Sequence, residues 1–190
     1  MDMKSEELTN LFERYRTRLR RMVDLRLDWG LRGRIDVSDI VQEAFLEAHR
    51  RRDDFDPAQM PSYLWLRMIV GQKLIDLHRY HVRAQKRSVL RESPLGVAEP
   101  SVSSVALAHE LADGATSVVE AAIRAERARM IETALLTMDD LDREVLALRH
   151  FEMLSNADAA HVLGISPNAA SNRYVRALKR LRELISPVDP

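Results

Sequence analysis

Apolar residues recur at helical spacing over most of the chain, with short polar breaks between the runs. In residues 5–28 they follow the three- and four-residue spacing that places side chains on one face of a helix. A second run begins near Asp36 or Ser38, and a third extends from Pro61 to about Lys86. These three runs predict three helices that enclose one core.

The helical pattern is interrupted over residues 92–116. Two prolines, two glycines and four serines break any regular period in this segment. Residues 105–111 retain enough apolar character for a helical turn or two. We therefore expect most of this segment to be a linker between two domains.

A second periodic region follows the interruption. Residues 118–136 again have helical spacing, and Asp139 or Asp140 can cap a further helix that continues through His150. No run alternates with the period of two that is typical of a strand. The sequence therefore predicts an all-α fold of two small helical domains joined by a flexible linker, with the domains at residues 1–91 and 117–190 and the linker at 92–116.

Residues 154–181, LSNADAAHVLGISPNAASNRYVRALKRL, contain two apolar-periodic runs on either side of a short break. Ser155 can cap the first run, and Gly164 stands where a left-handed backbone costs glycine little. Ser166 can cap the second run, and Pro167 suits its first turn. One helix ends, the chain turns and a second helix begins within three residues. This pattern predicts the tight corner of a helix-turn-helix. An αα hairpin inside a bundle is the alternative.

The second helix of this motif carries residue types that read DNA. Asn and Arg can pair bidentately with adenine and guanine in the major groove. A recognition helix presents its N-terminal part to base edges, while basic residues farther along suit phosphates. The residues that we expect to contact a duplex are Ser166, Asn168, Ser171, Asn172, Arg173, Arg176, Lys179 and Arg180.

Charge is balanced over the whole chain but unevenly distributed along it. The sequence has 29 Lys and Arg against 29 Asp and Glu, and a net charge of zero argues weakly against a nucleic-acid partner. Nevertheless, basic residues follow one another without an intervening acid over residues 79–91 and 173–182. Two such stripes on predicted helices are typical of phosphate contact. Two solvated helix faces remain the alternative.

Composition and motifs narrow the functional class. The chain has no cysteine, which fits a reducing cytosol and leaves no thiolate metal site. Its N-terminus has no apolar signal region, and no uncharged apolar run approaches a membrane span. It has no Gly-rich phosphate loop, Ser-His-Asp set or HExxH motif. We therefore expect a cytoplasmic protein that is not an enzyme and that needs no cofactor, metal or membrane.

Three motifs together resemble one family. Residues 36–45, DVSDIVQEAF, resemble the D-x-x-D-[LI]-V-Q-E-x-F signature of bacterial sigma factors. Trp65-Leu66, residues 72–76 and the basic run after them resemble the promoter-melting helix of that family. Residues 141–149, LDREVLALR, and the helix-turn-helix resemble its C-terminal domain. The two-domain layout is similar to that of the extracytoplasmic-function (ECF) group.

The resemblance implies a function and partners. A sigma factor binds core RNA polymerase, directs it to promoters and helps to melt the DNA. The expected partners are promoter DNA and the clamp and flap regions of the polymerase, with an anti-sigma factor left open. The resemblance assigns docking on the clamp coiled coil to Asp36, Asp39, Gln42 and Glu43. An acidic first turn that only favours its own helix dipole is the alternative for these residues.

The resemblance also assigns the two promoter elements. The helix-turn-helix would read the −35 element, and the third predicted helix would lie against the melted −10 element. Basic residues can hold strand phosphates and aromatic rings can stack on an unpaired base, although Trp65 suits core packing equally well. The residues assigned to the −10 element are Tyr63, Trp65, Gln72, Lys73, Arg79, Arg83, Lys86 and Arg87.

Two departures from the family pattern affect the promoter contacts. The melting helix has Gly71-Gln72 where Arg-Asn is usual, and the recognition helix has Ala169 and Ser171 where Thr and Lys are usual. The promoter preference of relatives therefore does not transfer to this chain. A helix-turn-helix regulator that binds duplex DNA without core polymerase is the alternative function.

Overall fold

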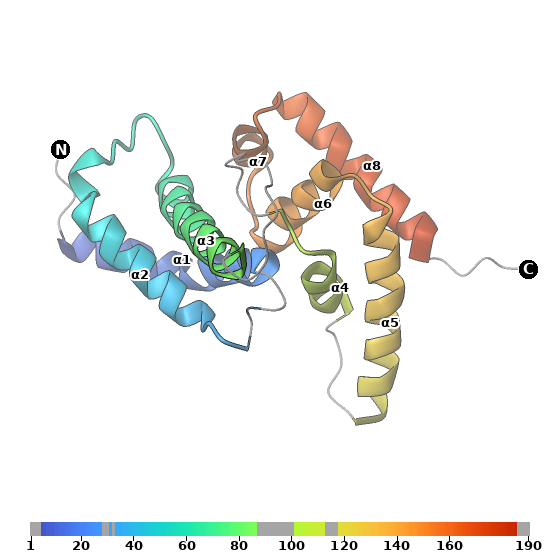
Figure 1. The fold of residues 1–190 in the computed structure, drawn as a ribbon. Coiled ribbons are helices and arrows are strands. Elements are labelled where there is room, and N and C mark those ends of the chain that lie inside the picture. The colour runs from blue at the N-terminus through green and yellow to red at the C-terminus, as the bar shows by residue number, and fades with distance from the viewer. Residues whose placement is uncertain (1–4, 28–30, 32, 87–100, 113–117, 186–190) are drawn as a thin grey trace, which may run out of the picture. The chain divides into compact units, whose positions relative to one another are not determined.

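The structure is a computed structural model, and every regular element that it describes is a helix (Figure 1). The chain divides into two compact units, Met1–Ser101 and Val102–Pro190. The predicted all-α class with two helical domains is thus confirmed. None of the described helices combines the length and apolar character that crossing a membrane requires. The described residues are 5–27, 31, 33–86, 101–112 and 118–185, without the side chains of 82–86 and 118–125.

Three helices that contact one another form the first unit (Figure 1). They are α1 (Ser5–Arg26), α2 (Val37–Arg50) and α3 (Ser62–Lys86), with the 3₁₀-helical turn η2 (Arg52–Asp54) after α2. The rings of Phe12 and Phe45 join α1 to α2, with 4.7 Å between their centroids. The core is made of apolar residues from all three helices, including Leu8, Leu19, Met22, Val23, Ile40, Val41, Leu66, Ile69 and Leu74.

The second unit is built from five α-helices and one π-helical turn among its described residues. They are α4 (Ser104–Ala112), α5 (Val118–Leu136), α6 (Asp140–Leu146), the π-helical turn η3 (Ala147–Phe151), α7 (Asn156–Leu163) and α8 (Pro167–Ile185). Helix α8 contacts α5, α6 and α7. The core includes Leu107, Leu135, Val145, Leu148, Ala159, Ala170 and Ala177.

Helix α4 corrects the expected extent of the linker, residues 92–116. The sequence pattern predicts only a helical turn or two in this segment, but α4 packs along α5 with Ala106, Leu107 and Ala108 buried. Burial of this apolar face stabilises a helix that the surrounding serines and glycines obscure in the sequence. Residues 102–112 therefore belong to the second unit, while 92–100 and 113–116 lie outside the described residues.

Candidate polymerase and nucleic-acid interfaces

The corner between α7 and α8 is built from the residues that predicted it. Ser155 Oγ accepts a hydrogen bond from the backbone N–H of Asp158 at 3.1 Å and donates to its carboxylate at 2.6 Å. Gly164 closes α7 in the left-handed region, with φ 64° and ψ 30°. At the start of α8, Ser166 Oγ accepts from the N–H of Ala169 at 3.2 Å. Both caps and the glycine turn are therefore as expected.

One further bond fixes this corner. The side-chain amide of Asn156 donates to the carbonyl of Pro167 at 2.7 Å and so ties the first turn of α7 to the first turn of α8. The sequence alone does not indicate this bond, because both residues also suit ordinary helix starts. The bond holds the two helices of the motif at a fixed separation at this end.

Helix α8 separates its residues by face. Ala170, Ala177 and Leu181 are buried and lie on one side, at helical spacing. The opposite side is exposed and mainly polar. It comprises Asn168, Ser171, Asn172, Val175, Arg176, Lys179 and Arg182. We call this side the α8 face, and it contains five of the eight residues expected at the duplex.

Two other expected DNA contacts on α8 are bonded within the second unit. Arg173 Nη1 lies 2.6 Å from Asp142 Oδ1 and 3.9 Å from Asp139 Oδ2, and its side chain is only 23% exposed. Arg180 donates to the carbonyl of Thr137 at 2.8 Å. Arg173 thus attaches α8 to α6, and Arg180 attaches it to the connection between α5 and α6. The bond to Asp142 gives Arg173 a role inside the unit that its place in a basic run did not suggest.

Helix α2 begins with a charged cap and carries an exposed acidic surface. Asp36 Oδ1 accepts from the backbone N–H of Ser38 at 2.7 Å. Hydrogen bonds from Ser38 lower the pKa of Asp36, and Arg20 acts in the same direction. The cap therefore stabilises the fold above the ordinary pKa of aspartate and is lost as the pH falls through the lowered value. The exposed residues between positions 36 and 46 are Asp36, Asp39, Gln42, Glu43 and Leu46, which we call the α2 face.

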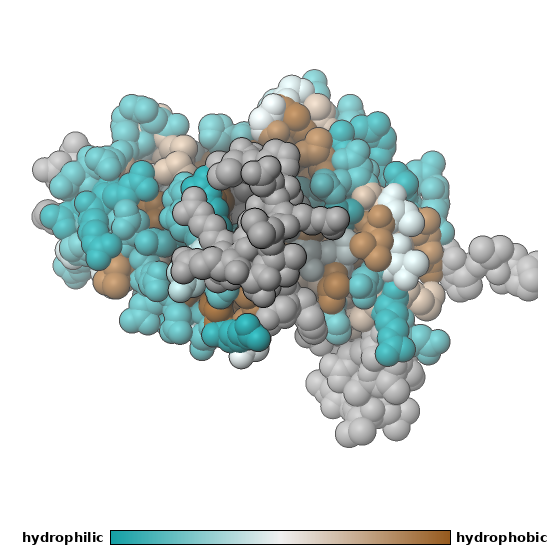
Figure 2. Space-filling view, viewed as in Figure 1, coloured by the Kyte–Doolittle hydropathy of each residue, from teal (hydrophilic) through white to brown (hydrophobic). Residues whose placement is uncertain are grey.

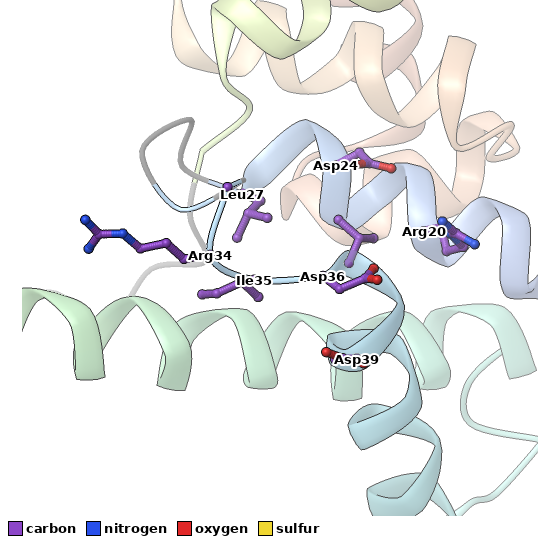
Figure 3. Close-up of a pocket in the computed structure, with 9 residues that line it drawn as sticks. Arg20, Asp24, Leu27, Arg34, Ile35, Asp36 and Asp39 are labelled. Carbon is purple, nitrogen blue, oxygen red and sulfur yellow. The ribbon is translucent and has the colours of Figure 1, made fainter.

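An open groove of about 610 Å³ borders the start of the α2 face (Figure 3). Arg20 and Asp24 line it from α1, and Asp36 and Asp39 line it from the start of α2, whereas Arg34 extends away from the two carboxylates. A second groove, of about 250 Å³, lies between α1 and α2. Its lining residues include Arg20 and Gln42. Three of the four expected docking residues, Asp36, Asp39 and Gln42, thus border the two grooves, and Arg20 lines both.

Helix α3 buries the two aromatic residues that were expected at DNA. Tyr63 and Trp65 are each 5% exposed. The ring of Tyr63 packs edge-on against Tyr15 at 5.3 Å, and the guanidinium of Arg18 lies 3.9 Å from its centroid. The ring of Trp65 packs against Phe55 at 4.8 Å. Neither ring offers a base a stacking surface in this structure, and core packing is the role that their contacts support.

The later part of α3 carries several exposed side chains. Gln72 is exposed and donates to Asp76 at 3.4 Å, and Arg79 lies 3.9 Å from the same carboxylate. Lys73 is half-buried. Tyr80 is 69% exposed. It was not among the residues expected at the −10 element, although an aromatic residue inside a basic stretch is a signal for stacking on an unpaired base. The side chains of Arg83 and Lys86, and the whole of Arg87, lie outside the described residues.

Comparison with known proteins accounts for both units. Residues 11–87 match the family described as Sigma-70 region 2, and residues 128–181 match Sigma-70, region 4. The chain is 35% identical over 151 residues to the RNA polymerase sigma factor CnrH of Cupriavidus metallidurans, over 79% of this chain and 73% of CnrH. The chain belongs to the sigma-70 family.

Further similarities place this sigma factor in the ECF group. It is 24% identical over 147 residues to the ECF RNA polymerase sigma factor SigK of Mycobacterium ulcerans, over 77% of this chain and 71% of SigK. It is also similar to the solved structure of CnrH in complex with the cytosolic domain of CnrY. That match has a TM-score of 0.56 and 26% identity, and covers 96% of this chain and 89% of that one.

The family resolves the choice between the two functions. As a sigma factor, the protein binds core RNA polymerase and directs it to promoter DNA for transcription initiation. A regulator that binds duplex DNA without polymerase would leave the region 2 match of the first unit without a role. The predicted family and function are therefore confirmed, whereas the roles of single residues stay predictions.

Proposed function

We propose that this sigma factor divides its work between three helices. The α2 face docks on the clamp coiled coil of the largest polymerase subunit, α3 holds the melted −10 element, and the α8 face reads the −35 element. The second unit also meets the flap region. The observation that carries this assignment is the exposure of both named faces on one side of a helix whose other side is buried.

The α2 face suits a basic helical partner. Asp39 and Glu43 are four residues apart and exposed, so that their carboxylates lie on the same side of α2. Leu46 continues this row and is 52% exposed. The acidic side chains attract a basic partner to this surface, and Leu46 becomes buried when the partner binds. The surface over the first unit is mainly hydrophilic from the side shown in Figure 2.

The α8 face suits the major groove. Asn168, Asn172 and Arg176 are exposed in its N-terminal half, where a recognition helix meets base edges. Lys179 follows on the same face at the distance suited to phosphates, whereas Arg180 lies outside this face and bonds to the carbonyl of Thr137. Arg173 lies outside the α8 face and pairs with Asp142 of α6, so we assign it to positioning α8.

The later part of α3 suits a single strand. Gln72, Lys73 and Arg79 offer hydrogen bonds and positive charge to phosphates on one stretch of helix. Arg83, Lys86 and Arg87 continue the basic run in the sequence. We leave Tyr63 and Trp65 out of this assignment because both rings are buried.

We also propose an anti-sigma partner and a cytoplasmic location. The related CnrH has been solved with the cytosolic domain of CnrY, and a similar regulator would suit this chain. The sigma factor supplies no chemical step of its own, since RNA synthesis belongs to the polymerase.

Reconstitution with core RNA polymerase tests the division of work. The promoter comes from mapping transcript starts after overexpression. Reversing the acids in Asp39→Arg/Glu43→Arg should abolish binding to core enzyme, whereas Arg176→Ala should leave that binding intact and reduce promoter-dependent transcripts about tenfold. Glu126→Arg, an exposed acid of α5, is the matched control for charge reversal.

Two outcomes would contradict the assignment. Full core binding by the double reversal would remove α2 from the polymerase interface. Loss of core binding by Arg176→Ala would make the α8 face a polymerase contact.

A further inference from the structure

Val175 is an apolar side chain at the centre of the α8 face. It is 61% exposed. Ser171 and Asn172 precede it by one turn, Arg176 is its neighbour, and Lys179 follows one turn later, all of them exposed. The residue therefore stands among the side chains proposed to reach base edges and phosphates.

The fold of the second unit gives no reason for a valine at this position. Ala170, Ala177 and Leu181 supply the buried side of α8, and Val175 lies on the opposite side. Valine is also a weaker helix former than alanine, lysine or arginine, because its β-branch loses rotamer freedom in a helix. Single exposed apolar residues are common, so the position of Val175 on the reading face is the informative feature.

The chemistry of the major groove offers a partner for such a side chain. Thymine places a 5-methyl group there, and no other base displays one. Asn172 is three residues before Val175, which corresponds to a rise of about 4.5 Å along the helix. Base pairs in DNA are stacked about 3.4 Å apart. A base read by Asn172 or Arg176 and a methyl group touched by Val175 would thus lie on the same or adjacent base pairs.

We infer that Val175 determines specificity by packing on the 5-methyl group of a thymine in the −35 element. This inference rests on the proposed role of the α8 face. It adds an apolar contact to the hydrogen-bonding residues and makes thymine the preferred base at one position. It also explains an exposed β-branched residue that the unit does not need for its own packing.

Removing single methyl groups from the DNA tests the contact. Holoenzyme made with the full-length chain is assayed on its mapped promoter, with each −35 thymine replaced in turn by deoxyuridine, which lacks only the 5-methyl group. Wild-type holoenzyme should lose about fourfold in promoter affinity at one thymine, the factor expected for one buried methyl group. Val175→Ala should lose a similar factor on the unmodified promoter and should no longer respond to deoxyuridine at that position.

Leu178→Ala is the matched control, because Leu178 is an exposed apolar residue of α8 outside the α8 face. This variant should keep the wild-type response to deoxyuridine. Thermal melting of Val175→Ala should be unchanged or slightly raised, since alanine is the better helix former, and this measurement excludes misfolding as the cause of weaker promoter binding.

The outcomes separate this inference from the function on which it rests. A wild-type holoenzyme that tolerates deoxyuridine at every −35 position overturns the methyl contact, and so does a Val175→Ala variant that stays sensitive. Failure of the proposed α8 role would look different: promoter use would then survive Arg176→Ala as well.

Discussion

Helices α3 and α8 both combine basic and apolar residues, but their buried positions follow different patterns. On α8 the buried residues Ala170, Ala177 and Leu181 form one stripe, and the α8 face lies opposite. On α3, residues 63–67 are five consecutive buried positions. A stretch of helix in which successive residues are buried cannot use its aromatic side chains for a ligand, whereas a helix with one buried stripe leaves its opposite face free. The pattern of burial thus decides which helix residues can read DNA.

The largest expected effect comes from the buried start of α3. Trp65→Ala should lower the free energy of unfolding by about 3–5 kcal/mol, because it removes a large ring from the core and leaves a cavity beside Phe55. Met68→Ala, at an exposed position of the same helix, should change it by less than about 0.5 kcal/mol. Denaturant unfolding of both variants measures the difference. A stable Trp65→Ala protein that fails only in opening promoters would restore Trp65 as a DNA contact.

The same contrast explains how far the sequence could predict these surfaces. The α8 face follows from helical periodicity together with Gly164 and the two serine caps, because all of these signals are local. The burial of Trp65 depends on Phe55, and the pairing of Arg173 depends on Asp142, thirty-one residues earlier in the chain. Such partners are brought together only by the tertiary fold. For this reason the sequence left both roles of Trp65 open and assigned Arg173 to DNA.

Helix α4 is a case in which local sequence signals wrongly favoured a linker. Its residues lie in a segment rich in breaking residues, so the local pattern favoured a linker. Contact with α5 buries Leu107 completely and makes the short helix part of the second unit. Short helices gain most of their stability from such packing rather than from propensity.

An intermediate effect should come from the pair that attaches α8 to α6. Arg173→Ala should lower the free energy of unfolding by about 2 kcal/mol, the scale of a hydrogen bond between charged groups that are largely shielded from solvent. Arg176→Ala should leave stability within about 0.5 kcal/mol because Arg176 is exposed. Both variants should weaken promoter use, but only the first through a less firmly held helix. Thermal melting and promoter-dependent transcription distinguish them.

Exchanging the two charges tests the positioning role of Arg173 directly. Arg173→Asp and Asp142→Arg should each destabilise the protein, and the double variant should recover part of the stability and of the promoter activity. If Arg173 acts on DNA instead, the double variant would regain stability and remain unable to use the promoter. Asp139 lies 3.9 Å from the same guanidinium, so recovery should be partial.

The smallest expected effect concerns Ser166, which caps α8 and also lies at the end of the helix that is expected to approach DNA. Ser166→Ala should cost about 1 kcal/mol of stability because the N–H of Ala169 loses its acceptor. Ser166→Asp should keep the cap, since aspartate is an equally good N-cap and favours the helix dipole. Next to phosphates, however, the new negative charge should weaken promoter binding more than alanine does. The two substitutions should therefore rank in opposite order in unfolding and in promoter affinity. If aspartate binds the promoter as well as serine does, Ser166 serves the helix alone and the DNA contact begins farther along α8.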